Sequence, residues 1–193
     1  MSGSLQRLSA YDQALYRSVA DMSTPVLDEP MRRVSDFANH SKPWFLVAGG
    51  LALLGGPQGR RAAVAGLGAI GATSLVVNLP LKMIGERSRP DRHGLGVPVQ
   101  RWVRMPASGS FPSGHSASAA AFAVAVGDVL PTLRPALRVA ASVVGFSRVY
   151  TGVHYPSDVL VGATVGAAFG RLAGWLALRG RSPSPAEDKE HRS

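Results

Sequence analysis

SRVYTGVHYPSD, residues 147–158, places an arginine, a histidine and an aspartate in one short segment between two apolar runs. A phosphate-sized anion would explain this composition, because Arg148 would hold its charge, His154 would attack it or shuttle protons, and Asp158 would orient the imidazole. The simpler interpretation is that Arg148 ends one helix and Asp158 lies in the first turn of the next, where the helix dipole favours an anion. The segment alone fits both interpretations, so the rest of the chain has to decide between them.

Composition favours a membrane protein with a single domain. Hydrophobic residues make up 46% of the 193 residues and charged residues only 17%, which is unusual for a soluble domain. The polar residues concentrate in 1–43, in 83–112 and at the C-terminus, and strongly apolar blocks lie between them. The chain has no cysteine, so disulfides and thiol chemistry are excluded.

The net charge of +9 indicates anionic partners. The basic residues are not interleaved with exposed aromatics and no recognition motif is present, so nucleic acid is not an expected partner. In an apolar chain, an excess of cations is better suited to anionic lipid or to a phosphorylated substrate. The predicted partners are therefore the membrane and a lipid phosphate.

Five apolar blocks predict the fold. They cover residues 44–55, 62–81, 115–130, 136–149 and 159–178. The second block, with ~20 residues, is long enough to cross a bilayer, and the first reaches that length if its helix begins near Asp36. We predict an all-α polytopic membrane bundle of about five transmembrane helices over residues 44–178, followed by a disordered charged tail over 179–193.

The region 1–43 is predicted to form amphipathic helices. The first shows apolar residues at helical spacing, namely Leu8, Leu15, Val19 and Met22. It should end near residues 23–25, and a second amphipathic piece should follow over 26–38. Residues 1–30 contain no apolar run of the signal-peptide type, so no cleavage is expected. Both helices could lie in the membrane interface or pack over the membrane domain.

The last apolar block carries a stripe of glycines at every fourth position: Gly162, Gly166, Gly170 and Gly174. Such a stripe lets another helix approach closely. We predict that the neighbouring helix belongs to the same fold. The alternative is a second copy of the chain, which would make a homo-oligomer through this face.

Arginines in the connections predict the orientation. Five spans would place the turns at 56–61 and 131–138 and the C-terminal tail on one side, which carries Arg60, Arg61, Arg134, Arg138, Arg179 and Arg181. The positive-inside rule makes that side cytoplasmic. The chain is thus predicted to be a multi-pass protein of the inner (plasma) membrane, with the 83–112 loop and the 152–157 turn on the extracytoplasmic side.

FPSGHSAS, residues 111–118, opens the third block with a helix start. Ser113 is a natural N-cap, and the amides of Gly114 and His115 point out of the first turn, so the helix N-terminus is suited to binding an anion. The simpler interpretation is an ordinary cap followed by a polar first-turn residue.

By the number of spans, this helix start lies on the same membrane face as residues 147–158 and as Lys82 and Arg89, which form the pattern K-x6-RP. Alone, Lys82 would be a snorkelling interface lysine. Together, Lys82, Arg89 and Arg148 supply cations for the oxygens of a phosphoryl group, and two histidines suffice for a two-step displacement. Because the set contains a single carboxylate, no metal site is predicted.

The segments KMIGERSRP, PSGH and SRVYTGVHYPSD resemble the tripartite signature of the type 2 phosphatidic acid phosphatase family, within the lipid phosphate phosphatase and vanadium haloperoxidase superfamily. They match K-x6-RP, PSGH and SR-x5-H-x3-D at every signature position over residues 82–158. The resemblance implies an all-helical membrane enzyme that hydrolyses lipid phosphates without a metal or another cofactor, at the extracytoplasmic membrane surface. Residues 44–178 would then be the phosphatase domain.

The resemblance also implies a role for each matching residue. His154 would form a phosphohistidine intermediate, Asp158 would support it, and His115 would act as general acid and then as base. The phosphoryl group would be bound by Lys82, Arg89, Arg148, Ser113 and Gly114.

Two other functions stay open at this point. One is a vanadium-haloperoxidase-like oxidase, since vanadate in the same pocket mimics the transition state of phosphoryl transfer; such relatives are usually larger and soluble. The other is a non-catalytic protein that binds or transports lipid phosphates. For a phosphatase, candidate substrates are phosphatidic acid, phosphatidylglycerophosphate and polyprenyl phosphates or diphosphates. The short chain and basic outer loop favour a diphosphate such as undecaprenyl or decaprenyl diphosphate, and the high Ala, Gly and Arg content favours a bacterial source.

Overall fold

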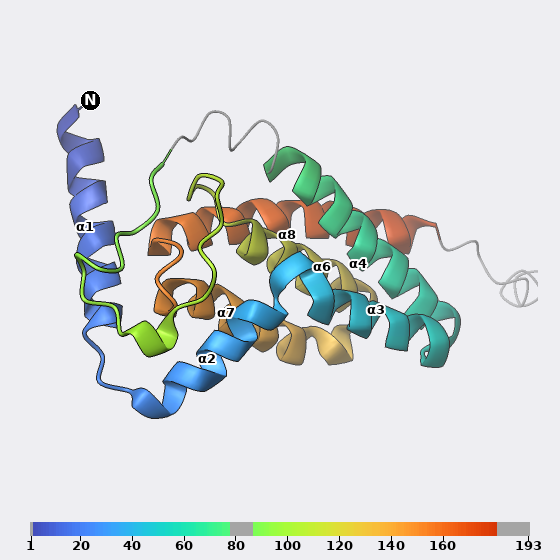
Figure 1. The fold of residues 1–193 in the computed structure, drawn as a ribbon. Helices are drawn as coiled ribbons and strands as arrows, with labels where there is room; N and C mark the ends of the chain where they lie inside the picture. The colour runs from blue at the N-terminus through green and yellow to red at the C-terminus, as the bar shows by residue number, and fades with distance from the viewer. Residues whose placement is uncertain (1, 78–86, 181–193) are drawn as a thin grey trace, which may run out of the picture.

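The computed structural model describes residues 2–77 and 87–180 of the chain (Figure 1). Over these residues it is helical and contains no strand, so the predicted all-α class is confirmed. The α-helices are α1 (Ser2–Ala20), α2 (Pro25–Phe37), α3 (Lys42–Leu54), α4 (Gly56–Val76), α6 (Gly114–Val129), α7 (Arg134–Tyr150) and α8 (Pro156–Arg179). Short 3-10 turns, η1 (Asn39–Ser41), η3 (Val99–Arg101) and η4 (Pro131–Leu133), connect them. The predicted tail beyond Gly180 lies outside the described residues.

Helix α6 forms the centre of the bundle. It packs against α4, α7 and α8, and its side chains Ala119, Phe122 and Val126 are fully buried. Figure 1 shows α1 standing across one end of this bundle, with the loop of residues 87–112 close to it. Tyr16 and Ala20 of α1 pack there in a small apolar cluster that includes Val149 at the end of α7.

The glycine stripe of α8 faces α6. A Cβ atom added at Gly162 would lie 2.4 Å from the Ser113 carbonyl oxygen, and one added at Gly166 would lie 2.0 Å from the Ala117 carbonyl oxygen. The neighbour predicted within the fold is therefore confirmed. Because α6 packs against all four glycines, the stripe itself is not open to a second copy of the chain. This close approach brings the starts of α6 and α8 together, and the Ser113 N–H donates to the Asp158 carbonyl at 2.9 Å.

The two N-terminal helices form where they were predicted, but α1 packs with a different face. Leu15 and Met22, on the predicted apolar face, are 58% and 40% exposed. The buried residues Asp12, Tyr16 and Ala20 repeat at every fourth position instead. Because this buried row includes the polar residue Asp12, a prediction from hydrophobic periodicity does not identify it.

The first apolar block does not extend back to Asp36, so that expectation is wrong. Helix α2 ends at Phe37, and His40 and Ser41 both have a φ of 58°. This left-handed backbone interrupts the helix, and α3, which begins at Lys42, is 13 residues long. The next helix begins at Gly56, before the predicted start at residue 62.

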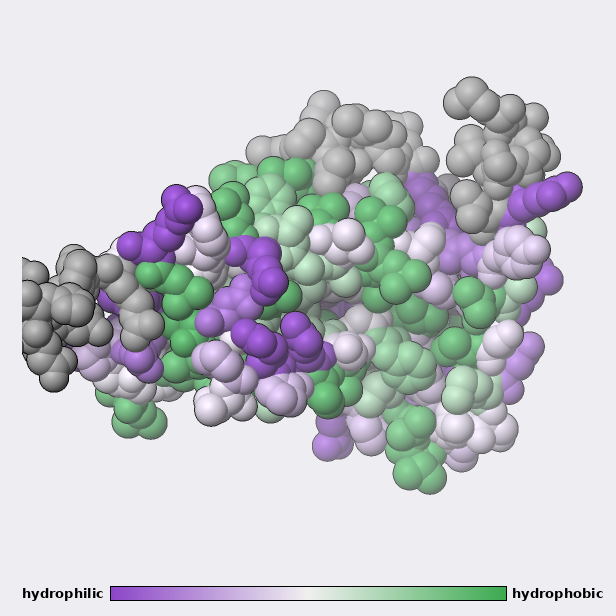
Figure 2. Space-filling view, turned by 180° about the vertical axis from the view of Figure 1, so that it is seen from behind, coloured by the Kyte–Doolittle hydropathy of each residue, from purple (hydrophilic) through white to green (hydrophobic). Residues whose placement is uncertain are grey.

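Among the described residues, one helix, α8, combines the length and apolar composition needed to cross a membrane. Helices α3, α6 and α7 have 13, 16 and 17 residues, fewer than the ~20 of a typical span. The predicted number of about five spans is therefore not confirmed. Large apolar side chains are nevertheless exposed on α3, α4 and α8, including Leu53, Leu54, Val64, Leu75, Leu160 and Leu172, and Figure 2 shows hydrophobic residues over much of one face.

Arg101 ties the end of α1 to α2 and to the loop. Its guanidinium donates to the carbonyls of Val19 and Ala20 at 3.1 and 3.2 Å and pairs with Asp28 at 2.8 Å. Arg101 is 1% exposed. It therefore fixes the N-terminal helices from a position that lies away from the site described next.

Candidate active site

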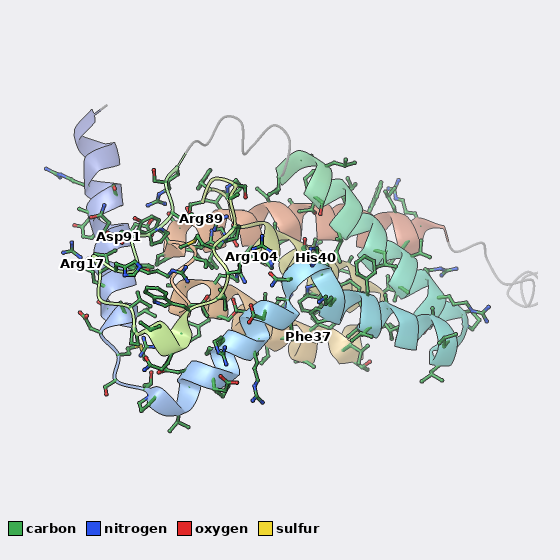
Figure 3. All side chains as sticks on the ribbon, viewed as in Figure 1. Arg17, Phe37, His40, Arg89, Asp91 and Arg104 are labelled. Atoms are coloured by element: carbon green, nitrogen blue, oxygen red, sulfur yellow. The ribbon has the colours of Figure 1, made fainter. Side chains whose placement is uncertain are left out.

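Three segments that carry the predicted site residues meet at the end of the bundle near α1. His115 and Gly114 at the start of α6, Arg89 of the loop and His154 of the α7–α8 turn line one pocket of about 230 Å³. The N-terminal region contributes His40 to the same pocket, and Figure 3 labels both His40 and Arg89. The other lining residues are Ser41, Ser74, Pro106, Ser108 and Ser118. Lys82 lies outside the described residues.

Ser113 caps α6 as predicted. Its side-chain oxygen accepts from the Ser116 backbone N–H at 3.4 Å and from the Ser116 hydroxyl at 3.0 Å. Ser113 itself is fully buried, whereas the next two residues, Gly114 and His115, line the pocket. Ser113 therefore shapes the helix start, and the first turn of α6 presents its amide end to the pocket.

His154 lies between Asp158 and Arg89. Its Nδ1 is 3.5 Å from Asp158 Oδ2, which is long for a hydrogen bond, and its Nε2 is 3.3 Å from an Arg89 terminal nitrogen. The side chains of His154 and Asp158 are 3% and 0% exposed. With Asp158 on the Nδ1 side, the Nε2 atom is the one that faces the basic pocket.

The surroundings of His154 keep its imidazole neutral. Burial lowers the pKa of His154 to about 4; the positive charges of Arg89 and Arg148 act in the same direction, and Asp158 opposes them. A neutral imidazole retains a lone pair on one ring nitrogen. His154 is thus in the protonation state that a nucleophile needs at neutral pH.

This environment can be measured directly. In detergent-solubilised protein labelled with ¹⁵N-histidine, we expect the ring signals of His154 to titrate with a midpoint of about 4. The His154→Gln variant removes these signals and so assigns them. A midpoint near the unperturbed value of ~6.5 would contradict the burial and the positive surroundings described above.

Arg89 is held in place by backbone carbonyls. Its guanidinium donates to Val153 O at 2.7 Å, to Ser108 O at 2.9 Å and to Gly109 O at 3.1 Å. These bonds fix the cation beside His154 and at the wall of the pocket. An arginine fixed in this way is preorganised to bind phosphoryl oxygens.

Arg148 lies behind the pocket, not in its wall. It is 1% exposed and donates to the backbone oxygen and the hydroxyl of Ser35 at 2.9 and 2.6 Å. Ser35 belongs to α2, so this helix helps to cover Arg148. The structure therefore does not bring Arg148 to the pocket surface, where the sequence predicted a phosphate ligand.

His115 has a partner that the sequence did not reveal. Its Nε2 is 2.9 Å from Asn39 Oδ1, and because this oxygen can only accept, Nε2 carries the proton in this contact. Asn39 lies in the short η1 turn between α2 and α3. The N-terminal region thus orients a pocket histidine, although nothing in the local sequence around Asn39 indicates it.

Asp158 also has partners outside the predicted set. Its Oδ1 accepts from Arg87 at 2.9 Å, and its Oδ2 accepts from the Tyr155 backbone N–H at 2.9 Å and from the Ser110 hydroxyl. Arg87 lies inside the K-x6-RP segment. The presence of a second arginine in that segment was the one sequence signal that could have indicated this partner of Asp158. Over residues 2–77 and 87–180, no three His, Asp or Glu side chains form a metal-binding group.

At one end of a helical bundle, Arg89, three histidines and the start of α6 line a pocket suited to a phosphoryl group. A sequence model of the PAP2 superfamily matches residues 63–180, and the chain belongs to this superfamily. Its relatives are named phosphatases, so the chain is a phosphatase, a hydrolase of phosphoric ester or anhydride bonds.

Named relatives agree with this assignment. The chain is 37% identical to the decaprenylphosphoryl-5-phosphoribose phosphatase of Mycobacterium tuberculosis over 144 residues, which cover 73% of this chain and 75% of that protein. It is 41% identical to the lipid A 1-phosphatase of Rhizobium johnstonii over 106 residues, 52% of this chain and 41% of that protein.

The fold agrees as well. The crystal structure of a transmembrane PAP2-type phosphatidylglycerolphosphate phosphatase from Bacillus subtilis superposes with a TM-score of 0.72 at 25% identity, covering 92% of this chain and 90% of that one. With this neighbour and the apolar helix α8, the chain is a membrane protein.

Proposed function

We propose that this membrane phosphatase hydrolyses the phosphorylated headgroup of a polyprenyl lipid through a phosphohistidine on His154, without a metal. One observation carries the proposal: a buried, neutral His154 presents Nε2 to a basic pocket, 3.3 Å from Arg89. Nucleophile and phosphate-binding cation are thus adjacent before substrate enters.

The first step would be attack of His154 Nε2 on phosphorus. Arg89 and the amide end of α6 at Gly114 would hold the phosphoryl oxygens, with Lys82 as a further cation. The N–P bond forms as the P–O bond to the lipid headgroup breaks. His115 would donate a proton to the departing oxygen, and Asp158 would stabilise the proton that remains on Nδ1 of His154.

The second step would release phosphate. His115, now deprotonated, would take a proton from a water molecule, and the water oxygen would attack phosphorus. The N–P bond breaks, and the electron pair returns to Nε2 of His154. Asn39 would keep the His115 ring oriented through both steps, because its contact at 2.9 Å does not involve the reacting atoms.

Pocket size limits what enters. A volume of about 230 Å³ lies below the roughly 300–1,000 Å³ of sites that enclose drug-sized ligands. The pocket therefore takes the phosphorylated end of a headgroup, and the hydrocarbon chain stays in the bilayer. We place the pocket on the extracytoplasmic side of a multi-pass inner-membrane protein, since Arg60 and Arg61 lie at the opposite end of α4 from the pocket residue Ser74.

The comparisons favour a polyprenyl lipid over lipid A. The alignment with the decaprenylphosphoryl-5-phosphoribose phosphatase covers 73% of this chain and 75% of that protein. The alignment with the lipid A 1-phosphatase covers 52% of this chain. We therefore propose a phosphomonoester on a polyprenyl-linked headgroup as the preferred substrate, in place of the diphosphate that the short chain and the basic outer loop favoured.

Comparative turnover tests this function. Purified protein in lipid nanodiscs would be given a decaprenyl-linked phosphopentose, a polyprenyl diphosphate, phosphatidic acid and phosphatidylglycerophosphate, each with EDTA present, and released phosphate would be measured. We expect kcat/KM to be at least about tenfold higher for the phosphopentose lipid, equivalent to ~1.4 kcal/mol of transition-state binding. Vanadate should inhibit as a transition-state mimic. Absence of phosphate release from all four lipids, or a rate that EDTA abolishes and added metal restores, would contradict the proposal.

A further inference from the structure

Asp12 of α1 is bound to the first turn of α8. Its Oδ1 accepts from the Ser157 backbone N–H at 2.8 Å, and its Oδ2 accepts from the Ser157 hydroxyl at 2.6 Å. A helix N-terminus leaves amides without intrahelical partners, and here one partner comes from 145 positions away in the chain. The Asp12 side chain is only 7% exposed, so this carboxylate is buried against the active-site turn.

Arg87 joins Asp12 to Asp158. One terminal nitrogen lies 2.7 Å from Asp12 Oδ2, and the other lies 2.9 Å from Asp158 Oδ1. The Tyr155 ring lies against the guanidinium, with its centroid 4.0 Å from Cζ. One cation therefore bridges two buried carboxylates, and it is the charged partner that both need in order to remain buried and ionised.

This bridge decides which oxygen of Asp158 faces His154. Arg87 holds Oδ1, and the Tyr155 N–H and the Ser110 hydroxyl hold Oδ2, the atom 3.5 Å from His154 Nδ1. Rotating the carboxylate would break bonds at both oxygens. Neither Arg87 nor Asp12 is among the residues that line the pocket, so both act on the pocket only through other residues.

We propose that Arg87 and Asp12 are positioning residues of the phosphatase. Arg87 orients Asp158 toward His154. Asp12 shares the positive charge of Arg87, so that Asp158 keeps enough negative charge to stabilise the protonated Nδ1 when Nε2 carries the phosphoryl group. Helix α1 is thereby part of the structure that supports catalysis. This inference rests on the proposed function, namely on the roles of His154 and Asp158.

A double-mutant cycle in the full-length protein tests the coupling. Arg87→Met should lower kcat by about 10- to 100-fold, the cost of a misplaced catalytic group, and change KM little, since Arg87 does not line the pocket. In the Asp158→Asn background the same change should lower kcat by less than about threefold, because residues that act as a unit are not additive. Arg87→Lys keeps the positive charge but lacks the planar guanidinium that can donate to two carboxylates at once, so it should recover part of the lost kcat.

Arg101→Met is the matched control. Like Arg87, Arg101 is an arginine of the loop that pairs with an N-terminal aspartate, in this case Asp28 at 2.8 Å, but it has no bond to Asp158. Its effect on kcat should be the same in both backgrounds, as expected for a purely structural residue. Thermal melting of every variant separates loss of fold from loss of positioning.

The ¹⁵N titration of His154 gives a readout that does not depend on turnover. Three charged groups act directly on this ring: Asp158 on α8, Arg89 on the loop and Arg148 on α7. Arg87 and Asp12 act on it through Asp158, and the pocket also holds His40 and His115. Arg87→Met removes the positive charge that Asp158 shares, so the titration midpoint of His154 should rise, even though the carboxylate is no longer held in the geometry that catalysis needs. In Asp12→Asn, Arg87 pairs with Asp158 as its only carboxylate, so the titration midpoint of His154 should not rise. If the two substitutions acted only by loosening the packing of α1, the titration midpoint of His154 would rise by the same amount in both variants.

Equal losses of kcat for Arg87→Met in the two backgrounds, a change in KM alone, or midpoints that rise together in both variants would overturn the inference. These results are distinguishable from failure of the proposed function. If Asp158→Asn and His154→Ala alone leave turnover intact, the proposed function itself fails. If they abolish turnover while Arg87→Met behaves like Arg101→Met, only the inference fails.

Discussion

Replacing His154 by alanine should lower kcat by at least about a thousandfold, in line with the loss of a nucleophile that acts in a catalytic unit. The variant has no atom that can form the N–P bond, whereas Arg89 and the start of α6 still bind the phosphoryl group. Arg89 is held by carbonyls of Val153, Ser108 and Gly109, so it should stay in place. Substrate affinity, measured with the uncleaved lipid, should therefore change little.

His93→Ala is the control for this prediction. His93 belongs to the same loop as Arg89 but packs against Trp102, with ring centroids 4.4 Å apart, and it does not line the pocket. This variant should keep kcat within about twofold, as is usual for substitutions away from a functional site. A His154→Ala enzyme that retains a tenth or more of wild-type turnover would show that another residue attacks phosphorus.

Replacing His115 by glutamine should lower kcat for the lipid substrate by roughly 10²- to 10⁴-fold, the usual contribution of a general acid or base. Glutamine keeps a hydrogen-bonding group near Asn39 but cannot carry the proton to the departing oxygen. A substrate whose leaving oxygen needs no protonation, such as a nitrophenyl phosphate, should bypass this loss in the first step. Formation of the phosphoenzyme from it should then be nearly as fast as in the wild type.

Asn39→Ala separates orientation from proton transfer. It removes the contact of 2.9 Å to His115 Nε2 but leaves the acid itself, so a loss of about tenfold or less is expected. If His115→Gln lowered turnover of the lipid and of the nitrophenyl ester by the same factor at the phosphorylation step, His115 would not be the acid.

Local sequence was sufficient to predict the start of α6 and the close packing of α8. The cap at Ser113 and the glycines at Gly162 and Gly166 are local signals with direct structural meaning, since a cap satisfies amides and a glycine permits close approach. Together they are consistent with a close approach of the starts of α6 and α8. The structure shows this arrangement in the bond between Ser113 N–H and Asp158 O.

The contribution of the N-terminal region could not be predicted in the same way. Asp12, Ser35 and Asn39 contact residues 76 to 145 positions away, and no pattern within 1–43 indicates those partners. Tertiary contacts also explain where the structure differs from the sequence-based expectations. Ser35 of α2 covers Arg148. The left-handed backbone of His40 and Ser41 separates α2 from α3, and the proline that marks this break, Pro43, lies in the first turn of α3.

The central claim is a covalent phosphohistidine at His154, and trapping it is the most direct test. The His115→Gln enzyme, mixed with ³²P-labelled nitrophenyl phosphate and quenched in alkali, should accumulate label, because the water-activating base of the second step is missing. Digestion should place this label on the peptide that contains His154, with the base stability and acid lability of a phosphoramidate, and the additional His154→Ala change should abolish it. Label on any other residue, or undiminished label in the doubly substituted enzyme, would contradict the mechanism.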